Sequence, residues 1–175
     1  IDPIDGTRAF IGQKYTFTTL IALCHRGKPI VGVIDQAIRK ERWVGNTQTF
    51  FNGEHTHPEL KQTLADATIA TTSMTYFSAA ETIGFTALEH ASRNTILNHD
   101  GYAFGLLANG DVDIALEVKL KPYDFCALVP IVQGAGGIIT DWSGNPITIA
   151  SAGDVIASTN KTLHSQALDL LQRHR

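Results

Sequence analysis

The sequence is poor in cysteine and has no long apolar run. Its 175 residues include two cysteines, Cys24 and Cys126, which are far apart and in no metal-binding or redox spacing. We therefore expect two buried, reduced thiols in a cytoplasmic protein. No apolar run approaches the roughly 20 residues that cross a bilayer, so we expect no membrane contact. The 17 acidic and 14 basic side chains give a net charge of −3, which argues against nucleic-acid binding.

The remaining composition, 43% hydrophobic and 18% charged, is that of a soluble globular protein. Strand-like and helix-like segments alternate along it, which predicts an α/β fold. Residues 54–66 are polar and contain Pro58, so we expect an internal boundary there, with parts at 1–62 and 63–175. The helices predicted from the pattern are Tyr76–Ser92, Tyr102–Ala108, Tyr123–Gln133 and Lys161–Arg175.

The most informative segment lies at the start of the sequence, where residues 2–7 read Asp-Pro-Ile-Asp-Gly-Thr. Carboxylates are ligands for Mg²⁺, which commonly binds one or two of them together with substrate phosphate. Pro3 favours an extended conformation at Asp2. Gly6 permits close approach of a ligand, and the amides of Gly6 and Thr7 at a helix start suit a phosphate. The segment thus favours a metal and phosphate site, although the same residues also form ordinary turns and helix caps.

A second segment supports the metal interpretation. It reads Lys-Pro-Tyr-Asp-Phe-Cys-Ala over residues 121–127 and continues into an apolar run. Pro122 is suited to the first turn of a helix, which places the Asp124 carboxylate near the start of that helix. A charge at the head of so apolar a helix needs a partner, and a metal ion would be one.

Together these segments resemble the inositol monophosphatase superfamily of Mg²⁺-dependent phosphomonoesterases. The first motif matches in full, whereas in the second Tyr123 stands where the family usually has Trp, and Phe125 is larger than usual. The sequence over residues 121–132 resembles the histidinol-phosphate phosphatase branch, as do Gly-Val-Ile-Asp-Gln at 32–36 and Glu-Arg-Trp-Val-Gly at 41–45. The resemblance extends along the whole chain.

The resemblance implies a layered αβαβα sandwich with a metal site between its two halves. It also implies two or three Mg²⁺ ions, which Mn²⁺ can replace, and a small phosphorylated substrate. The roles that it assigns are metal binding by Asp2, the Ile4 carbonyl, Asp5 and Asp124; catalysis by Asp2 and Thr7; and phosphate binding by the amides of Gly6 and Thr7.

Two further acidic residues are expected to lie beside the substrate and contact it. Glu117 follows an apolar strand-like run just before the second motif, and in relatives a glutamate at this spacing contacts the substrate. Without the resemblance, Glu117 would equally be a strand-end residue that faces solvent. Asp100 matches a segment ahead of a helix that faces the substrate, but Asn98 and His99 replace glycines of the relatives, which leaves the shape of that loop open.

In the family, an N-terminal segment with a Glu-Glu pair precedes the first motif, and one glutamate binds metal. Because Ile1 stands one residue before the motif, the resemblance implies a C-terminal part of a longer, homodimeric enzyme, inactive by itself. Three interpretations follow: a histidinol-phosphate phosphatase of histidine biosynthesis, an inositol or related sugar-phosphate phosphatase, or a non-catalytic metal-binding remnant.

Overall fold

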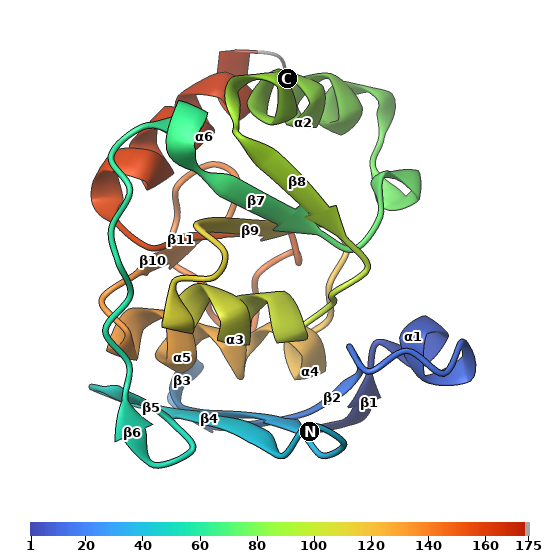
Figure 1. The fold of residues 1–175 in the computed structure, drawn as a ribbon, viewed down its shortest axis with the longest axis vertical. Helices are drawn as coiled ribbons and strands as arrows, with labels where there is room; N and C mark the ends of the chain where they lie inside the picture. The colour runs from blue at the N-terminus through green and yellow to red at the C-terminus, as the bar shows by residue number, and fades with distance from the viewer. Residues whose placement is uncertain (174–175) are drawn as a thin grey trace.

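The computed structural model describes residues 1–173 and shows two β-sheets with helices between and beside them (Figure 1). The first sheet has six antiparallel strands in sequence order: β1 (Asp2–Asp5), β2 (Thr18–His25), β3 (Lys28–Gln36), β4 (Glu41–Gly45), β5 (Thr49–Phe51) and β6 (Glu54–His55). Local turn residues explain this meander. Arg26 and Gly27, for example, have φ of 48° and 79°, which suits the tight β2–β3 hairpin.

The second sheet has five strands in the order β10-β11-β9-β7-β8. Strand β7 is parallel to β8 and β9, and β11 is antiparallel to β9 and β10. The bounds are β7 (Thr68–Thr71), β8 (Asn94–Leu97), β9 (Ile114–Glu117), β10 (Ile138–Thr140) and β11 (Val155–Ser158). The helices are α1 (Thr7–Ile11), α2 (Ala79–Ala91), α3 (Tyr102–Asn109), α4 (Pro122–Phe125), α5 (Leu128–Gly134) and α6 (Lys161–Arg173).

The elements form layers, as predicted. Figure 1 shows α2 and α6 outside the five-stranded sheet, α3, α4 and α5 between the two sheets, and the six-stranded sheet beyond them. Leu20, Ile34 and Trp43 lie opposite one another on neighbouring strands and are fully buried against the central helices. Glycines allow this close packing, because a Cβ at Gly105 of α3 would lie 2.9 Å from the Trp43 ring. This central helix layer carries the second sequence motif.

The opposite face of the six-stranded sheet is apolar and open within residues 1–173. Ile21, Leu23, Val44 and Phe50 are 41%, 57%, 39% and 37% exposed. Ile21 and Val44 alternate with buried neighbours because successive side chains of a strand point to opposite faces. In Figure 1 no described helix lies over this face, so the layers seen are helices, sheet, helices and sheet.

Two sequence predictions about local structure need correction, and a third extends beyond the described residues. The helix predicted over Tyr123–Gln133 is divided into α4 and α5. Pro130 has no N–H to donate to the Cys126 carbonyl four residues earlier, which interrupts the helical hydrogen bonds. The helix predicted from Tyr76 begins instead at Ala79, because Ser78 and Glu81 form a reciprocal capping box. The last two residues of the predicted helix Lys161–Arg175 lie outside the described residues.

The cysteines also differ from expectation. Cys126 is buried, but Cys24 is exposed, because near the end of β2 it borders a surface hollow that it shares with Ala22, Pro122 and Cys126. The two thiols are neighbours in space despite their separation in sequence. Burial, followed by the contact with Cys24, raises the pKa of Cys126 to about 12.

Candidate functional site

The first motif forms an edge strand followed at once by a helix. Asp2 and Asp5 begin and end β1, and Gly6 then adopts φ of +77°, which a residue without Cβ tolerates. The Asp2 carboxylate accepts a hydrogen bond from the Ile4 amide at 3.1 Å, as in an Asx-type turn. Asp5, in contrast, does not cap α1, which begins at Thr7. Turn formation therefore explains part of the motif and leaves the Asp5 carboxylate for another role.

Thr7 forms a hydrogen bond with the same segment. Its Oγ1 donates a hydrogen bond of 3.1 Å to the Ile4 carbonyl, the backbone oxygen predicted to bind metal. Ile4, Gly6 and Thr7 all line the cavity that also contains Asp2. The structure thus places the predicted phosphate-binding turn beside the first motif's carboxylates.

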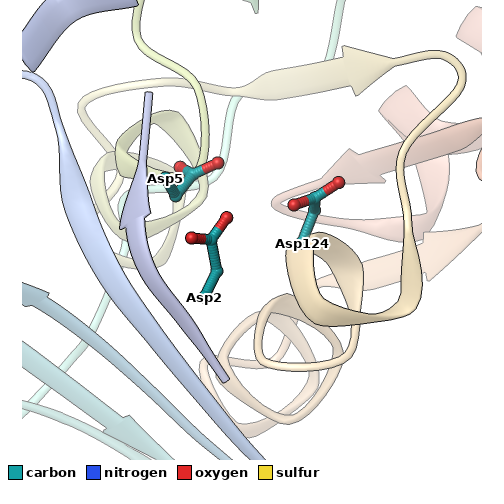
Figure 2. A group of neighbouring side chains, drawn as sticks. All are labelled: Asp2, Asp5 and Asp124. Atoms are coloured by element: carbon teal, nitrogen blue, oxygen red, sulfur yellow. The ribbon is translucent and has the colours of Figure 1, made fainter. Parts of the chain in front are cut away.

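The second motif places Asp124 in the first turn of α4, where Pro122 occupies an N-terminal position. One Asp124 oxygen accepts a hydrogen bond of 2.7 Å from the Lys121 amide. This bond holds the carboxylate at the helix start, facing β1 (Figure 2). The orientation is the one that the sequence predicted.

Asp2, Asp5 and Asp124 converge from opposite sides of one gap, as Figure 2 shows. Each offers a carboxylate oxygen, and these oxygens lie within 4.8 Å of one another. Three like charges this close repel one another unless a cation or a proton lies among them. Burial, helped by Asp2, raises the pKa of Asp124 to about 6. The donor set, all oxygen and all anionic, fits a hard divalent cation.

Asp5 is the most enclosed of the three carboxylates. Its Oδ2 accepts hydrogen bonds from Thr18 Oγ1 at 3.2 Å and from the Gly101 amide at 2.7 Å. Burial raises the pKa of Asp5 to about 7, even though the Gly101 hydrogen bond lowers it, and the charges of the neighbouring aspartates add to the rise. A bound cation would offset this cost of keeping the carboxylate ionised.

Glu117 ends β9 and is 4% exposed, so the solvent-facing alternative is wrong. Its Oε1 accepts hydrogen bonds from the amide and the hydroxyl of Thr72, at 2.5 and 2.7 Å. Burial raises the pKa of Glu117 to about 8, against the lowering effect of both Thr72 bonds. A carboxylate this deeply buried gains most from a cationic or hydrogen-bond-donating partner.

Asp100 lies in the loop whose shape the sequence left open. Asn98 and Asp100 have φ of 65° and 45°, the left-handed conformation that glycine adopts readily. Asn and Asp tolerate this conformation best among other residues, so the loop keeps a glycine-like path. Burial raises the pKa of Asp100, and hydrogen bonding with Thr72 opposes that rise.

All of these groups border one cavity of about 440 Å³. It contains the predicted residues Asp2, Ile4, Asp5, Gly6, Thr7, Asp100, Glu117 and Asp124. Sequence reasoning missed Thr72, Tyr76 and Lys119, which also line it. Thr72 carries no local signal, because its partner Glu117 is 45 positions away.

Comparison with known proteins identifies the family to which this chain belongs. The model of the inositol monophosphatase family matches residues 1–175, and the chain belongs to that family. One similar solved structure is an inositol monophosphatase from Zymomonas mobilis. It is 46% identical with a TM-score of 0.95, over 98% of this chain and 68% of that one.

Two curated relatives carry more specific names. The bifunctional phosphatase IMPL2, chloroplastic, of Arabidopsis thaliana is 43% identical over 99% of this chain, which spans about half (53%) of that protein. The histidinol-phosphatase of Mycobacterium tuberculosis is 30% identical over 98% of this chain and 68% of its own length. Among residues 1–173, no helix is both long and apolar enough to cross a membrane.

Proposed function

We propose that this protein is a Mg²⁺-dependent phosphomonoesterase. The observation that carries the proposal is the approach of three carboxylates, Asp2, Asp5 and Asp124, to within 4.8 Å beside a turn suited to phosphate. These carboxylates and the Ile4 carbonyl would hold two or three Mg²⁺ ions, with Mn²⁺ as a substitute. Bound ions would supply positive charge for the phosphate and would increase the acidity of water.

The residues of the first motif would act on the phosphate and on the attacking water. The amides of Gly6 and Thr7 would hold phosphate oxygens at the start of α1. The Thr7 hydroxyl, which now donates to Ile4 at 3.1 Å, would orient the attacking water. Holding water and phosphate together in this way lowers the entropic part of the barrier.

We further propose histidinol phosphate as the substrate. The support is a buried carboxylate, Glu117, and a half-buried one, Asp100, in the cavity that contains the three aspartates. Histidinol phosphate carries a primary ammonium group, and a carboxylate is its natural partner. Relatives named histidinol-phosphatase, such as that of Mycobacterium tuberculosis, agree with this choice.

Inositol phosphate is the competing substrate, because the relative from Zymomonas mobilis is named an inositol monophosphatase. Its hydroxyls could also donate to Glu117. The deciding experiment measures kcat/KM of the full-length protein with Mg²⁺ for histidinol phosphate and for inositol 1-phosphate. We expect histidinol phosphate to be favoured by about 10-fold or more, the order of one charge-assisted hydrogen bond. The reverse preference would identify an inositol phosphatase, and no hydrolysis of these or of other small sugar phosphates would identify a metal-binding remnant.

A further inference from the structure

Two tyrosines line the cavity, and they come from different parts of the fold. Tyr123 precedes the aspartate of the second motif, on the side of the three converging carboxylates. Tyr76 ends a 3₁₀ turn (Met74–Tyr76) that follows Thr72, the residue that holds Glu117. Tyr76 therefore follows, in the same segment, the residue that holds Glu117, and it lines the same cavity as Glu117.

Tyr76 is fixed from two sides by cationic side chains. The Arg8 guanidinium of α1 lies over its ring, 5.0 Å from the ring centroid. Lys119 Nζ donates a hydrogen bond of 2.5 Å to the Tyr76 carbonyl, and Lys119 is two residues beyond Glu117. The ring also packs partly against the core beneath α2. A ring held in this way loses little side-chain entropy when a ligand contacts it.

Arg8 lies near Asp100 as well as near the Tyr76 ring. Arg8 and Asp100 line one small hollow of about 90 Å³, which shares Thr72 and Asp100 with the main cavity. The positive charge of Arg8 acts on the Asp100 carboxylate and opposes the effect of its burial. Tyr76, Asp100 and Glu117 thus line the same cavity, and Arg8, beside it, lies over Tyr76 and acts on Asp100.

We propose that Tyr76 is a specificity-determining residue, whose ring packs against a planar ring in the organic part of the substrate. This inference rests on the proposed function. In histidinol phosphate, one methylene joins the imidazole to the carbon that bears the ammonium. With its ammonium held by Glu117 and Asp100, the substrate would place its imidazole in the cavity that Tyr76 also lines. Aromatic pairs of this kind add affinity beyond the area that they bury.

The test compares two substrates that differ only at the imidazole. Alaninol phosphate keeps the phosphate and the amine of histidinol phosphate but has a methyl group in place of the imidazolylmethyl group. The full-length protein with Mg²⁺ is assayed as wild type, Tyr76→Leu and Tyr76→Phe. We expect Tyr76→Leu to raise KM for histidinol phosphate by about 3- to 10-fold, with kcat nearly unchanged. KM for alaninol phosphate should stay the same, and Tyr76→Phe should behave as wild type on both substrates.

The outcomes separate this inference from the proposed function. If the wild type hydrolyses histidinol phosphate and Tyr76→Leu leaves its KM unchanged, the role of Tyr76 is overturned while the proposed function stands. Equal losses on both substrates would show that Tyr76 supports the fold, which also overturns the inference. If the wild type hydrolyses neither substrate, both the role of Tyr76 and the proposal of histidinol phosphate as substrate are overturned. Thermal unfolding of each variant confirms that the comparison concerns folded proteins.

Discussion

The Asp5 carboxylate accepts a 2.7 Å hydrogen bond from the amide of Gly101, a residue 96 positions later in the sequence. The bond joins the first sheet to the loop that opens α3. It also requires a glycine, because a Cβ at Gly101 would lie 2.7 Å from Asp5 Oδ2 and 3.1 Å from Leu20. One contact therefore fixes the most buried carboxylate of the candidate metal site.

Gly101→Ala should weaken metal binding although every proposed ligand keeps its identity. The added methyl group displaces the Asp5 carboxylate, and losing such a supporting contact typically costs about 10- to 100-fold in metal affinity. Calorimetric titration with Mn²⁺ measures this change. Gly84→Ala is a matched control, because it adds the same methyl group in α2, 3.3 Å from Leu171 and away from the site. An unchanged affinity in Gly101→Ala would mean that Asp5 does not bind the ion.

Glu117→Gln should lower kcat/KM for histidinol phosphate by about 10- to 150-fold, the loss expected for one charge-assisted hydrogen bond. Hydrolysis of p-nitrophenyl phosphate, which has no amine, should hardly change. Glu54→Gln, at an exposed position in β6, controls for loss of one negative charge. Equal losses on both substrates would assign Glu117 to the fold or to the metal site.

His164 should make stability depend on pH. Its ring nitrogens contact Thr140 Oγ1 at 2.9 Å and Ser158 Oγ at 3.2 Å, and burial lowers the pKa of the imidazole from 6.5 to about 4. Between these values the unfolded chain binds a proton that the folded chain does not. The contribution of His164 to the free energy of unfolding should therefore fall as pH drops from 6.5 to 4, by up to about 1.4 kcal/mol per unit. The raised pKa values of Asp5, Asp124 and Glu117 act in the opposite direction over this range, so the His164 contribution is isolated by comparison with a variant. In urea titrations, the free energy of unfolding of the wild type minus that of His164→Asn should decrease as pH drops through this window. Equal slopes for both proteins would refute the assignment.

The open face of the six-stranded sheet should cause residues 1–175 to self-associate when they are produced alone. Contiguous exposed apolar surface of this kind marks an interaction surface or an aggregation site. Leu23→Lys combined with Val44→Lys should shift the sedimentation profile toward monomer, because two charges then interrupt the apolar face. Ile83→Lys, at a 56% exposed position in α2, should have no such effect. A wild-type chain that stays monomeric at high concentration would contradict this prediction.

The sequence predicts local structure better than it predicts contacts. The β2–β3 hairpin and the end of α3 at Gly110 follow from turn and cap residues, and both are present. The division between α4 and α5 could also have been predicted, since Pro130 lies in the apolar run. Exposure of Cys24 could not, because it depends on the surface hollow that Cys24 shares with Pro122 and Cys126, residues distant in the sequence.

In the candidate site, too, the local features could be predicted from the sequence and the long-range contacts could not. Metal-binding chemistry is indicated by the residues of each motif, but spacing alone does not bring Asp124 to β1. That expectation came from family resemblance, and the convergence of the three aspartates agrees with it. Thr72 and Tyr76 had no signal in the sequence, because their importance arises from contacts with Glu117 and Arg8 across the fold.

The central claim is that Asp2, Asp5 and Asp124 bind a divalent cation, and anomalous diffraction from crystals grown with Mn²⁺ tests it most directly. We predict an anomalous peak among the three carboxylates, and its loss in an Asp124→Asn variant that still folds. Ordered carboxylates with no peak among them, or a peak only at other groups, would contradict the metal site and the phosphatase mechanism built on it.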